Sequence, residues 1–274
     1  MYCDYWKLRT QPFENRCDGD LYYPADSHQT ALLKLRYAIE NRRAAAIICG
    51  PSGVGKSMLI NTLRKQLPEQ FRPFCQIVFP ILAGDQLLRY LVELLDSAGG
   101  PGSDTASALA RFERFLQANL ESKRHAIIVV DEAHLLEQNE LFEPLRLLLN
   151  VAADRAPGES AWTLVLAGQP TLLSQVERYH ALDERLAVKC MLNRFLPEET
   201  SAYILHRIRA VGGIADNIFT PAAIDVIHNF TRGIPRRINR LCDLALMVGY
   251  AEDLPRIDTP TIENVQNELG VAVG

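Results

Sequence analysis

The sequence predicts an α/β core with a largely parallel sheet, followed by a small all-helical domain. Short apolar runs alternate with segments of helical periodicity over the first two-thirds of the chain, which is a βαβ rhythm. The runs are continuously apolar, as expected for strands that helices cover on both faces. From Pro197 onward these runs stop and helical periodicity takes over.

Five apolar runs predict the strands. The longest of them fall far short of the roughly 20 residues that a membrane-spanning helix needs, so they have the length of strands. The predicted strands are residues 44–49, 76–79, 126–130, 162–168 and, as a weaker run, 188–192.

Helices are predicted between these strands. Segments 27–40 and 106–120 each place four large apolar side chains on one face. Two stretches rich in Gly, Pro and polar residues, 99–104 and 154–160, predict loops. The apolar faces consist of Leu32, Leu33, Leu35 and Ile39 in the first helix and Leu109, Phe112, Phe115 and Leu116 in the second.

Four more helices are predicted after Pro197. Thr220 and Thr259 are each followed by proline, which gives a hydroxyl N-cap and a proline at the first helical position. The predicted helices lie within residues 197–212, 220–230, 234–250 and 259–269.

The end of the strand-like runs sets the predicted domain limits. Residues 1–196 form the α/β core, which includes an N-terminal segment of residues 1–26, and residues 197–274 form the helical domain.

The composition of the 274 residues is that of a globular protein, with 48% hydrophobic and 23% charged residues, which excludes disorder. A formal net charge of −4 excludes a histone-like basic coat but not a local basic patch. The N-terminus has acidic residues and no unbroken apolar segment, so no secretory signal is predicted. The six cysteines are scattered without a C-x-x-C pair and are interpreted as unpaired thiols of a cytoplasmic protein.

The segment IICGPSGVGKSMLI contains the phosphate-binding P-loop pattern, G-x-x-x-x-G-K-[ST], between a predicted strand and a predicted helix. Small residues let backbone N–H groups face phosphate oxygens, and the helix N-terminus adds partial positive charge. Lys56 is expected to reach the β- and γ-phosphates and Ser57 to be a Mg²⁺ ligand. The predicted nucleotide-binding residues are Gly50, Pro51, Ser52, Gly53, Val54, Gly55, Lys56 and Ser57.

Two carboxylates, Asp131 and Glu132, directly follow the predicted strand 126–130. The P-loop leaves the same edge of a parallel sheet. Asp131 is predicted to hold Mg²⁺ through its water shell, and Glu132 to orient and deprotonate the attacking water. Asp-Glu-Ala-His also spells a helicase box, but the other helicase segments are missing, so His134 is interpreted as incidental.

Further polar residues are expected to complete the site. Gln169, at the tip of the predicted strand 162–168, is expected to contact the γ-phosphate or the attacking water. Arg185 is predicted to enter a neighbouring subunit's site as a finger that stabilises phosphoryl charge, with Arg194 as the alternative. This role implies a homo-oligomer.

A basic stretch follows the Gly-Ile-Pro turn of the helical domain. Arg236 is expected to swing toward the phosphates when this domain closes as a lid. Arg232, Arg237 and Arg240 form either a solvated helix N-terminus or a DNA-binding patch. Residues 197–274 hold 7 Arg and no Lys against 10 acidic residues, a net charge of −3, so any nucleic-acid contact must be local.

With these motifs in place, the chain resembles the AAA+ ATPases and, more narrowly, the general secretion pathway protein A (ExeA-like) family. The resemblance covers nearly the whole chain, and its most specific segments are LAGQP and GIPRRINRLCDLAL. It implies a sheet ordered 5-1-4-3-2 with a helical lid, ATP and Mg²⁺ as ligands, Asp131 and Glu132 as the Walker-B pair, Gln169 as sensor 1 and Arg236 as sensor 2.

The chain also departs from the family pattern. Lys189 stands where the family commonly has Arg, and Leu-Asn-Arg-Phe at 192–195 replaces Leu-x-Pro-Leu, which leaves the finger assignment open. Full-length secretion members carry a membrane segment and a periplasmic peptidoglycan-binding part. The predicted core and helical domain account for nearly all of the 274 residues, so we expect any anchoring of this chain to come from a partner.

These features predict an oligomeric ATPase, a ring or filament, that hydrolyses ATP to ADP and phosphate to assemble or remodel a secretion or pilus-type machine. One alternative is an ATP-dependent, DNA-bound regulator of transposition, and another is a nucleotide-gated adaptor with negligible turnover. Glu132 favours hydrolysis over the adaptor, and the acidic net charge weighs against the DNA-bound regulator.

Overall fold

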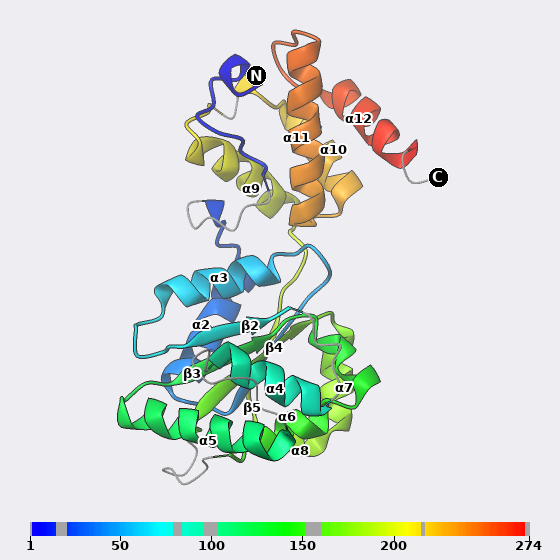
Figure 1. Ribbon diagram of the computed structural model, residues 1–274. Helices are drawn as coiled ribbons and strands as arrows, with labels where there is room; N and C mark the ends of the chain where they lie inside the picture. Colours follow the sequence, from blue (N-terminus) through cyan, green and yellow to red (C-terminus); the bar gives the residue numbers. More distant parts are fainter. Residues whose placement is uncertain are drawn as a thin grey trace. The chain divides into compact units, whose positions relative to one another are not determined.

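The structure is a computed structural model that describes residues 2–14, 21–78, 84–95, 104–151, 160–214 and 217–271 (Figure 1). It divides into two compact units. The sheet unit comprises Ser27–Pro51 and Leu59–Leu192, and the helical unit comprises Met1–Asp26, Ser52–Met58 and Asn193–Gly274.

The sheet unit is built on five parallel strands in the order β2-β3-β4-β1-β5. This is the predicted order 5-1-4-3-2 read from the other edge, so the predicted fold is confirmed. The run predicted at 76–79 forms a strand that begins and ends two residues earlier, and Phe79 lies outside the described residues. The strands are β1 (Ala45–Cys49), β2 (Phe74–Ile77), β3 (Ala126–Val130), β4 (Trp162–Gly168) and β5 (Leu186–Met191).

Helices cover both faces of this sheet, which makes three layers. Every residue of β1, β3 and β4 is buried, as the continuous apolar runs predict. Alternate residues of these strands share one large core cluster with helices α4 to α8, and Cys190 of β5 contacts α2 on the other side. The helices of this unit are α2 (Asp26–Glu40), α3 (Lys56–Gln66), α4 (Gly84–Leu95), α5 (Thr105–Glu121), α6 (Phe142–Leu148), α7 (Thr171–Arg178) and α8 (His180–Asp183), with the 3₁₀ turns η2 (Ala133–Leu135) and η3 (Glu137–Asn139).

The apolar faces predicted for two of these helices are corrected in part. In α2, Leu33 is 67% exposed, and the small residues Ala31 and Ala38 lie on the buried face instead. In α5, Phe112 and Leu116 are buried as predicted, while Leu109 and Phe115 are only partly buried. The loops predicted at 99–104 and 154–160 lie outside the described residues except for Asp104, which caps α5, and Ser160.

The helical unit has a hydrophobic core of its own. Four C-terminal helices are found where the sequence predicts them, and Trp6 and Phe13 of the N-terminal segment are buried in the same core. The indole N–H of Trp6 donates to the carbonyl of Leu246 at 2.9 Å. The division predicted at Pro197 stays a prediction. The described part of the N-terminal segment, which the sequence assigns to the α/β core, packs with the C-terminal helices. They are α1 (Tyr2–Tyr5), α9 (Pro197–Ala210), α10 (Pro221–Thr231), α11 (Pro235–Ala251) and α12 (Thr259–Val271).

A buried arginine fastens the N-terminal segment to α9. Arg207 is 2% exposed, and its guanidinium donates to the backbone carbonyls of Pro12 at 2.5 Å and Glu14 at 2.7 Å. The guanidinium also lies 5.7 Å from the ring centroid of Tyr203. Since a buried charge is tolerated only when it is well hydrogen-bonded, these carbonyls make the segment part of the helical unit.

Among the described residues, no helix is long and apolar enough to cross a membrane. The five described cysteines form no disulfide with one another, and Cys17 lies outside the described part of the chain.

One predicted cap is confirmed and the other is wrong. The Thr220 hydroxyl accepts from the Ala223 N–H at the start of α10. At α12 the cap is Asp258 and not Thr259, because the Asp258 carboxylate accepts from the backbone N–H of Thr261 at 3.1 Å and from its hydroxyl at 2.7 Å.

Replacing Asp258 by alanine is expected to lower the free energy of unfolding by about 1 kcal/mol, the usual effect of losing a cap. Thr259→Ala is the matched control and leaves stability nearly unchanged. The hydrogen bond from the Thr261 side chain is the main cause that holds the pKa of Asp258 below its usual value. The stabilisation is therefore present at neutral pH and is lost as the pH falls below about 4, and denaturant unfolding at several pH values measures it. A larger loss in the Thr259 variant would contradict this assignment.

Candidate functional site

The predicted P-loop has the strand–turn–helix form that phosphate binding requires. β1 ends at Cys49, and α3 begins at Lys56. Gly53 and Gly55 have φ of +82° and +107°, conformations that favour glycine. Lys56 is buried, with 7% of its surface exposed. A glycine-containing turn that leads into a helix N-terminus is the kind of segment that binds an anion.

Within the helical unit, Gly53 lies against the first turn of α11. The Arg236 N–H donates to the Gly53 carbonyl at 3.2 Å. A Cβ added at Gly53 would lie 2.9 Å from the Cβ of Arg236 and 3.2 Å from Cγ2 of Ile234. The structure therefore brings Arg236 next to the P-loop, and the Arg236 side chain is exposed.

In the sheet unit, hydrogen bonds orient Asp131 at the end of β3. Its backbone N–H donates to the carbonyl of Ile77 at 2.8 Å. Its carboxylate accepts from the Glu132 N–H at 2.9 Å and from the Gln76 amide at 3.2 Å. Because Asp131 is also 7% exposed, its carboxylate has little freedom to rotate.

Glu132 has a strained backbone. Its φ of 50° and ψ of 34° lie in the left-handed region, where a residue with a Cβ is uncommon and costs about 1–3 kcal/mol. The side chain is 48% exposed, and its Oε2 lies 3.4 Å from Nδ1 of His134. Such strain clusters at functional sites, where the surrounding structure maintains it.

The end of β4 lies between the start of the P-loop, which follows β1, and the loop that follows β3. The Gly168 carbonyl accepts from the Gly50 N–H at 3.2 Å. A Cβ at Gly168 would lie 3.1 Å from the backbone nitrogen of His134 and 2.9 Å from Cδ2 of Leu172. Gln169 follows and is exposed. Since β4 pairs with both β3 and β1, Asp131, Gln169 and Gly50 leave one edge of the sheet on adjacent strands.

The predicted finger arginines lie on either side of β5. Arg185 precedes the strand and is half-buried, and Arg194 follows it and is exposed. Lys189, within the strand, forms an ion pair with Asp183 at 2.6 Å, and this hydrogen bond is the main cause that raises the pKa of Lys189. Lys189 is therefore engaged inside its own unit.

The two predicted magnesium ligands carry oxygen donors, which are the ligands that Mg²⁺ prefers. The described residues contain no group of three or more His, Cys, Asp or Glu side chains that could hold a metal by themselves. A site of the predicted kind needs fewer protein ligands, because Mg²⁺ keeps several waters and also binds substrate phosphates. Ser57 carries a hydroxyl oxygen and Asp131 a carboxylate oxygen, and both are donors of the kinds that such a site uses.

Some residues of this region have no role in the sequence-based prediction. Gly168 is one of them, and its signal is a glycine that ends an apolar strand, which indicates a close backbone approach. His134 is interpreted from the sequence as incidental, yet its ring and its backbone both contact this region. Gln175 of α7 donates to the His134 carbonyl, and nothing in its local sequence indicates this.

The chain is similar in sequence to known proteins. Residues 39–176 match the model of a protein family described as the AAA domain. The chain is 30% identical over 263 residues to general secretion pathway protein A of Aeromonas hydrophila, covering 94% of this chain and 46% of that protein. It therefore spans about half the length of that relative.

Solved structures share the fold at low sequence identity. The Aeropyrum pernix ORC2 protein is 15% identical, with a TM-score of 0.68 over 94% of this chain and 71% of that chain. The Aeropyrum pernix ORC1 protein, solved in complex with DNA, is 12% identical, with a TM-score of 0.68 over 96% and 69%. The Thermotoga maritima RuvB Holliday junction branch migration motor is 20% identical, with a TM-score of 0.59 over 89% and 68%.

Replacing Gly53 by alanine tests the contact between the P-loop and α11. The variant is expected to lose about 1–2 kcal/mol of stability from its left-handed backbone. It is also expected to bind nucleotide about tenfold more weakly, because the new Cβ displaces the turn from Arg236. Calorimetry with a non-hydrolysable ATP analogue and denaturant unfolding measure the two effects.

Gly212→Ala is the matched control for this change. Gly212 has a φ of +85°, but a Cβ there would meet the flexible side chain of Arg9. The control is expected to lose similar stability and to bind nucleotide normally. Equal nucleotide affinity in both variants would contradict a role for the Gly53 contact.

Proposed function

The chain belongs to the AAA domain family, and from this premise we propose that it hydrolyses ATP to ADP and phosphate. The observation that carries the proposal is the edge of the sheet unit, where three adjacent strands end in Asp131, Gln169 and the start of the P-loop. In a parallel sheet this edge is where ligands bind.

The P-loop would hold the phosphates of ATP. Its backbone N–H groups, from Gly50 to Ser57, would contact phosphate oxygens, and Lys56 would neutralise charge on the β- and γ-phosphates. Ser57 and Asp131 would hold Mg²⁺, which when bound neutralises charge that develops during transfer. Burial of Lys56 supports this role, since a partly desolvated ammonium interacts more strongly with phosphate.

Glu132 would act as the general base. Its half-exposed carboxylate can reach a water molecule, while the neighbouring Asp131 is hydrogen-bonded and buried. The attacking water would give its proton to Glu132 as its oxygen approaches the γ-phosphorus. Gln169, exposed at the tip of β4, would orient this water or contact the γ-phosphate.

Arginines would supply the remaining positive charge. Arg236, at the first turn of α11 beside Gly53, would contact the phosphates of the same chain. Arg185 would enter the site of a neighbouring copy in an oligomer, with Arg194 as the alternative. The ion pair of Lys189 with Asp183 supports these two over Lys189.

We further propose that the ATPase cycle serves the assembly or remodelling of a secretion or pilus-type machine. The similarity to general secretion pathway protein A over 94% of this chain supports this setting. The protein partner is a component of that machine, and association with the inner membrane would come through it.

Glu132→Gln is expected to bind ATP with wild-type affinity and to hydrolyse it about 10²- to 10⁴-fold more slowly, the usual contribution of a general base. Steady-state phosphate release and nucleotide titration measure the two properties. Glu140→Gln is the matched control, because Glu140 is exposed and has the same left-handed backbone, with φ of 54°. Wild-type turnover in the Glu132 variant would refute its role as base, and negligible turnover in the unaltered protein would favour the adaptor.

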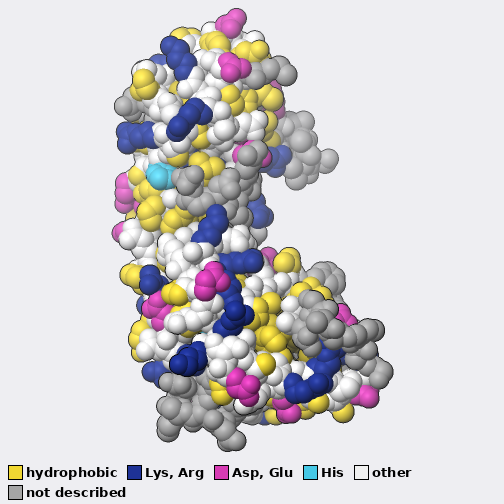
Figure 2. Space-filling view, turned by 60° about the vertical axis from the view of Figure 1, so that its left-hand side comes forward, with side chains coloured by type: hydrophobic (Ala, Val, Ile, Leu, Met, Phe, Trp, Pro, Cys, Tyr) yellow, Lys and Arg dark blue, Asp and Glu magenta, His cyan; other side chains and the backbone are white. Residues whose placement is uncertain are grey.

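DNA binding separates the secretion setting from the transposition setting. Acidic side chains lie among the basic ones on the face shown in Figure 2, and residues 197–274 carry a net charge of −3. We expect only weak, salt-sensitive binding of duplex DNA, with Kd above about 1 μM at physiological salt, both with and without ATP. Fluorescence anisotropy measures this, and tight ATP-dependent binding would overturn the secretion setting.

A further inference from the structure

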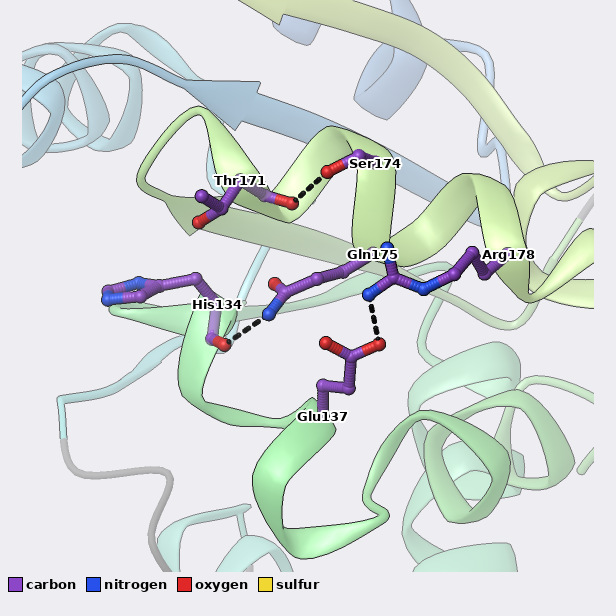
Figure 3. A network of polar contacts seen from close by, with 6 residues as sticks. All are labelled: His134, Glu137, Thr171, Ser174, Gln175 and Arg178. Carbon is purple, nitrogen blue, oxygen red and sulfur yellow. Dashed lines mark hydrogen bonds and ion pairs between the residues drawn. The ribbon is translucent and has the colours of Figure 1, made fainter.

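The loop that carries Glu132 is held by the helix that follows Gln169. After β3 the chain passes through the left-handed Glu132 and the turns η2 and η3, and helix α7 lies alongside this path (Figure 3). Figure 3 shows the side chains of Gln175 and Arg178 pointing from α7 toward the loop. These contacts lie wholly within the sheet unit.

Gln175 makes the more buried of the two contacts. Its Nε2 donates to the backbone carbonyl of His134 at 3.0 Å. Because a carbonyl only accepts, the amide must present its NH₂ group there. The other amide atom, Oε1, is buried and has no hydrogen-bond partner among the described residues. An unpartnered acceptor is unfavourable for stability, so stability alone does not explain a glutamine at this position.

Arg178 makes the second contact one turn further along α7. Its guanidinium forms an ion pair with Glu137 of η3 at 2.5 Å. The Arg178 side chain is 60% exposed, and exposed ion pairs contribute little. Gln175 and Arg178 are three residues apart and therefore share one face of the helix. Of the two, the Gln175 hydrogen bond is the stronger restraint on the loop.

The same helix is anchored to the strand that ends at Gln169. The Leu172 N–H donates to the Gln169 carbonyl at 3.0 Å at the start of α7. The absence of a Cβ on Gly168 lets the His134 backbone nitrogen approach the end of β4. The His134 peptide segment is thus held from β4 on one side and from α7 on the other. Two residues earlier, Glu132 has the strained conformation that such support must maintain.

We propose that Gln175 is a positioning residue for ATP hydrolysis: through the His134 carbonyl it holds the loop on which Glu132 meets the attacking water. The inference rests on the proposed function, in which Glu132 is the base. Gln175 does not touch the reacting atoms. Loss of its hydrogen bond lets the loop relax from the strained conformation, which misplaces the Glu132 carboxylate.

Two substitutions remove the N–H donor while keeping the length of the side chain. Gln175→Glu places a carboxylate oxygen where the NH₂ group was, and Gln175→Met places an uncharged methyl group there. Both variants are expected to show kcat about tenfold lower, within the range that misplacement of a catalytic group produces. KM for ATP and the affinity for a non-hydrolysable ATP analogue stay at wild-type values, because the P-loop is unaltered.

Ser174→Ala is the matched control on the same helix. Ser174 is exposed, and its hydroxyl donates to the Thr171 carbonyl of its own turn at 2.9 Å. This variant is expected to have wild-type kcat and KM. Gln175→Met keeps the test valid if the buried charge of Gln175→Glu prevents folding, and circular dichroism confirms folding of each variant.

The outcomes separate this inference from the proposed function. Lower kcat with unchanged KM in the Gln175 variants, together with an inactive Glu132→Gln, supports both. Wild-type kcat in folded Gln175→Met, with Glu132→Gln inactive, overturns the inference alone. Wild-type hydrolysis by Glu132→Gln overturns the proposed base and the inference with it. A parallel rise of KM and fall of kcat in Gln175→Met also overturns the positioning role, since it indicates general distortion of the site.

Discussion

The close approach of backbone segments at Gly168 is the constraint on which the candidate site depends. Its carbonyl accepts from the first residue of the P-loop, and its missing Cβ leaves room for the His134 nitrogen. Both neighbours follow strands that flank β4, so the sheet order alone brings them to this point. Any side chain at Gly168 would separate the loop after β3 from the end of β4. A single glycine therefore lets the three segments of the candidate site meet at one edge of a parallel sheet.

The strained backbone of Glu132 is a second consequence of the close approach of segments at Gly168. A loop that leaves β3 and must cross the end of β4 has to turn at once, and the left-handed backbone of Glu132 makes that turn. The Asp131 carboxylate satisfies the N–H of the strained residue, and Gln175 fixes the peptide that follows. The Asp131 carboxylate, which we propose as a Mg²⁺ ligand, is thereby already oriented in the protein itself, and this would lower the reorganisation required on nucleotide binding.

Sequence patterns predict this fold well where contacts are local or periodic. Continuous apolar runs identify the strands, and the P-loop pattern identifies the turn after β1. The apolar face of α2 is mispredicted because its buried face includes Ala31 and Ala38, so the leucines alone do not mark it. The cap of α12 is mispredicted because Asp258 precedes the Thr-Pro pair and offers a stronger acceptor. Gln175 is missed because its partner lies 41 residues away.

The contacts that organise the site are mostly between backbone atoms, and this limits what sequence comparison detects. The Gly53 carbonyl accepts from a backbone N–H of α11, and the Gly168 carbonyl accepts from one of the P-loop. Such contacts constrain residue type only where a Cβ would intervene, so most surrounding side chains are free to differ. This accounts for a fold shared with solved structures at low identity. Two side chains add restraint to backbone segments, as Gln175 does at the His134 carbonyl and Arg207 does at the N-terminal segment.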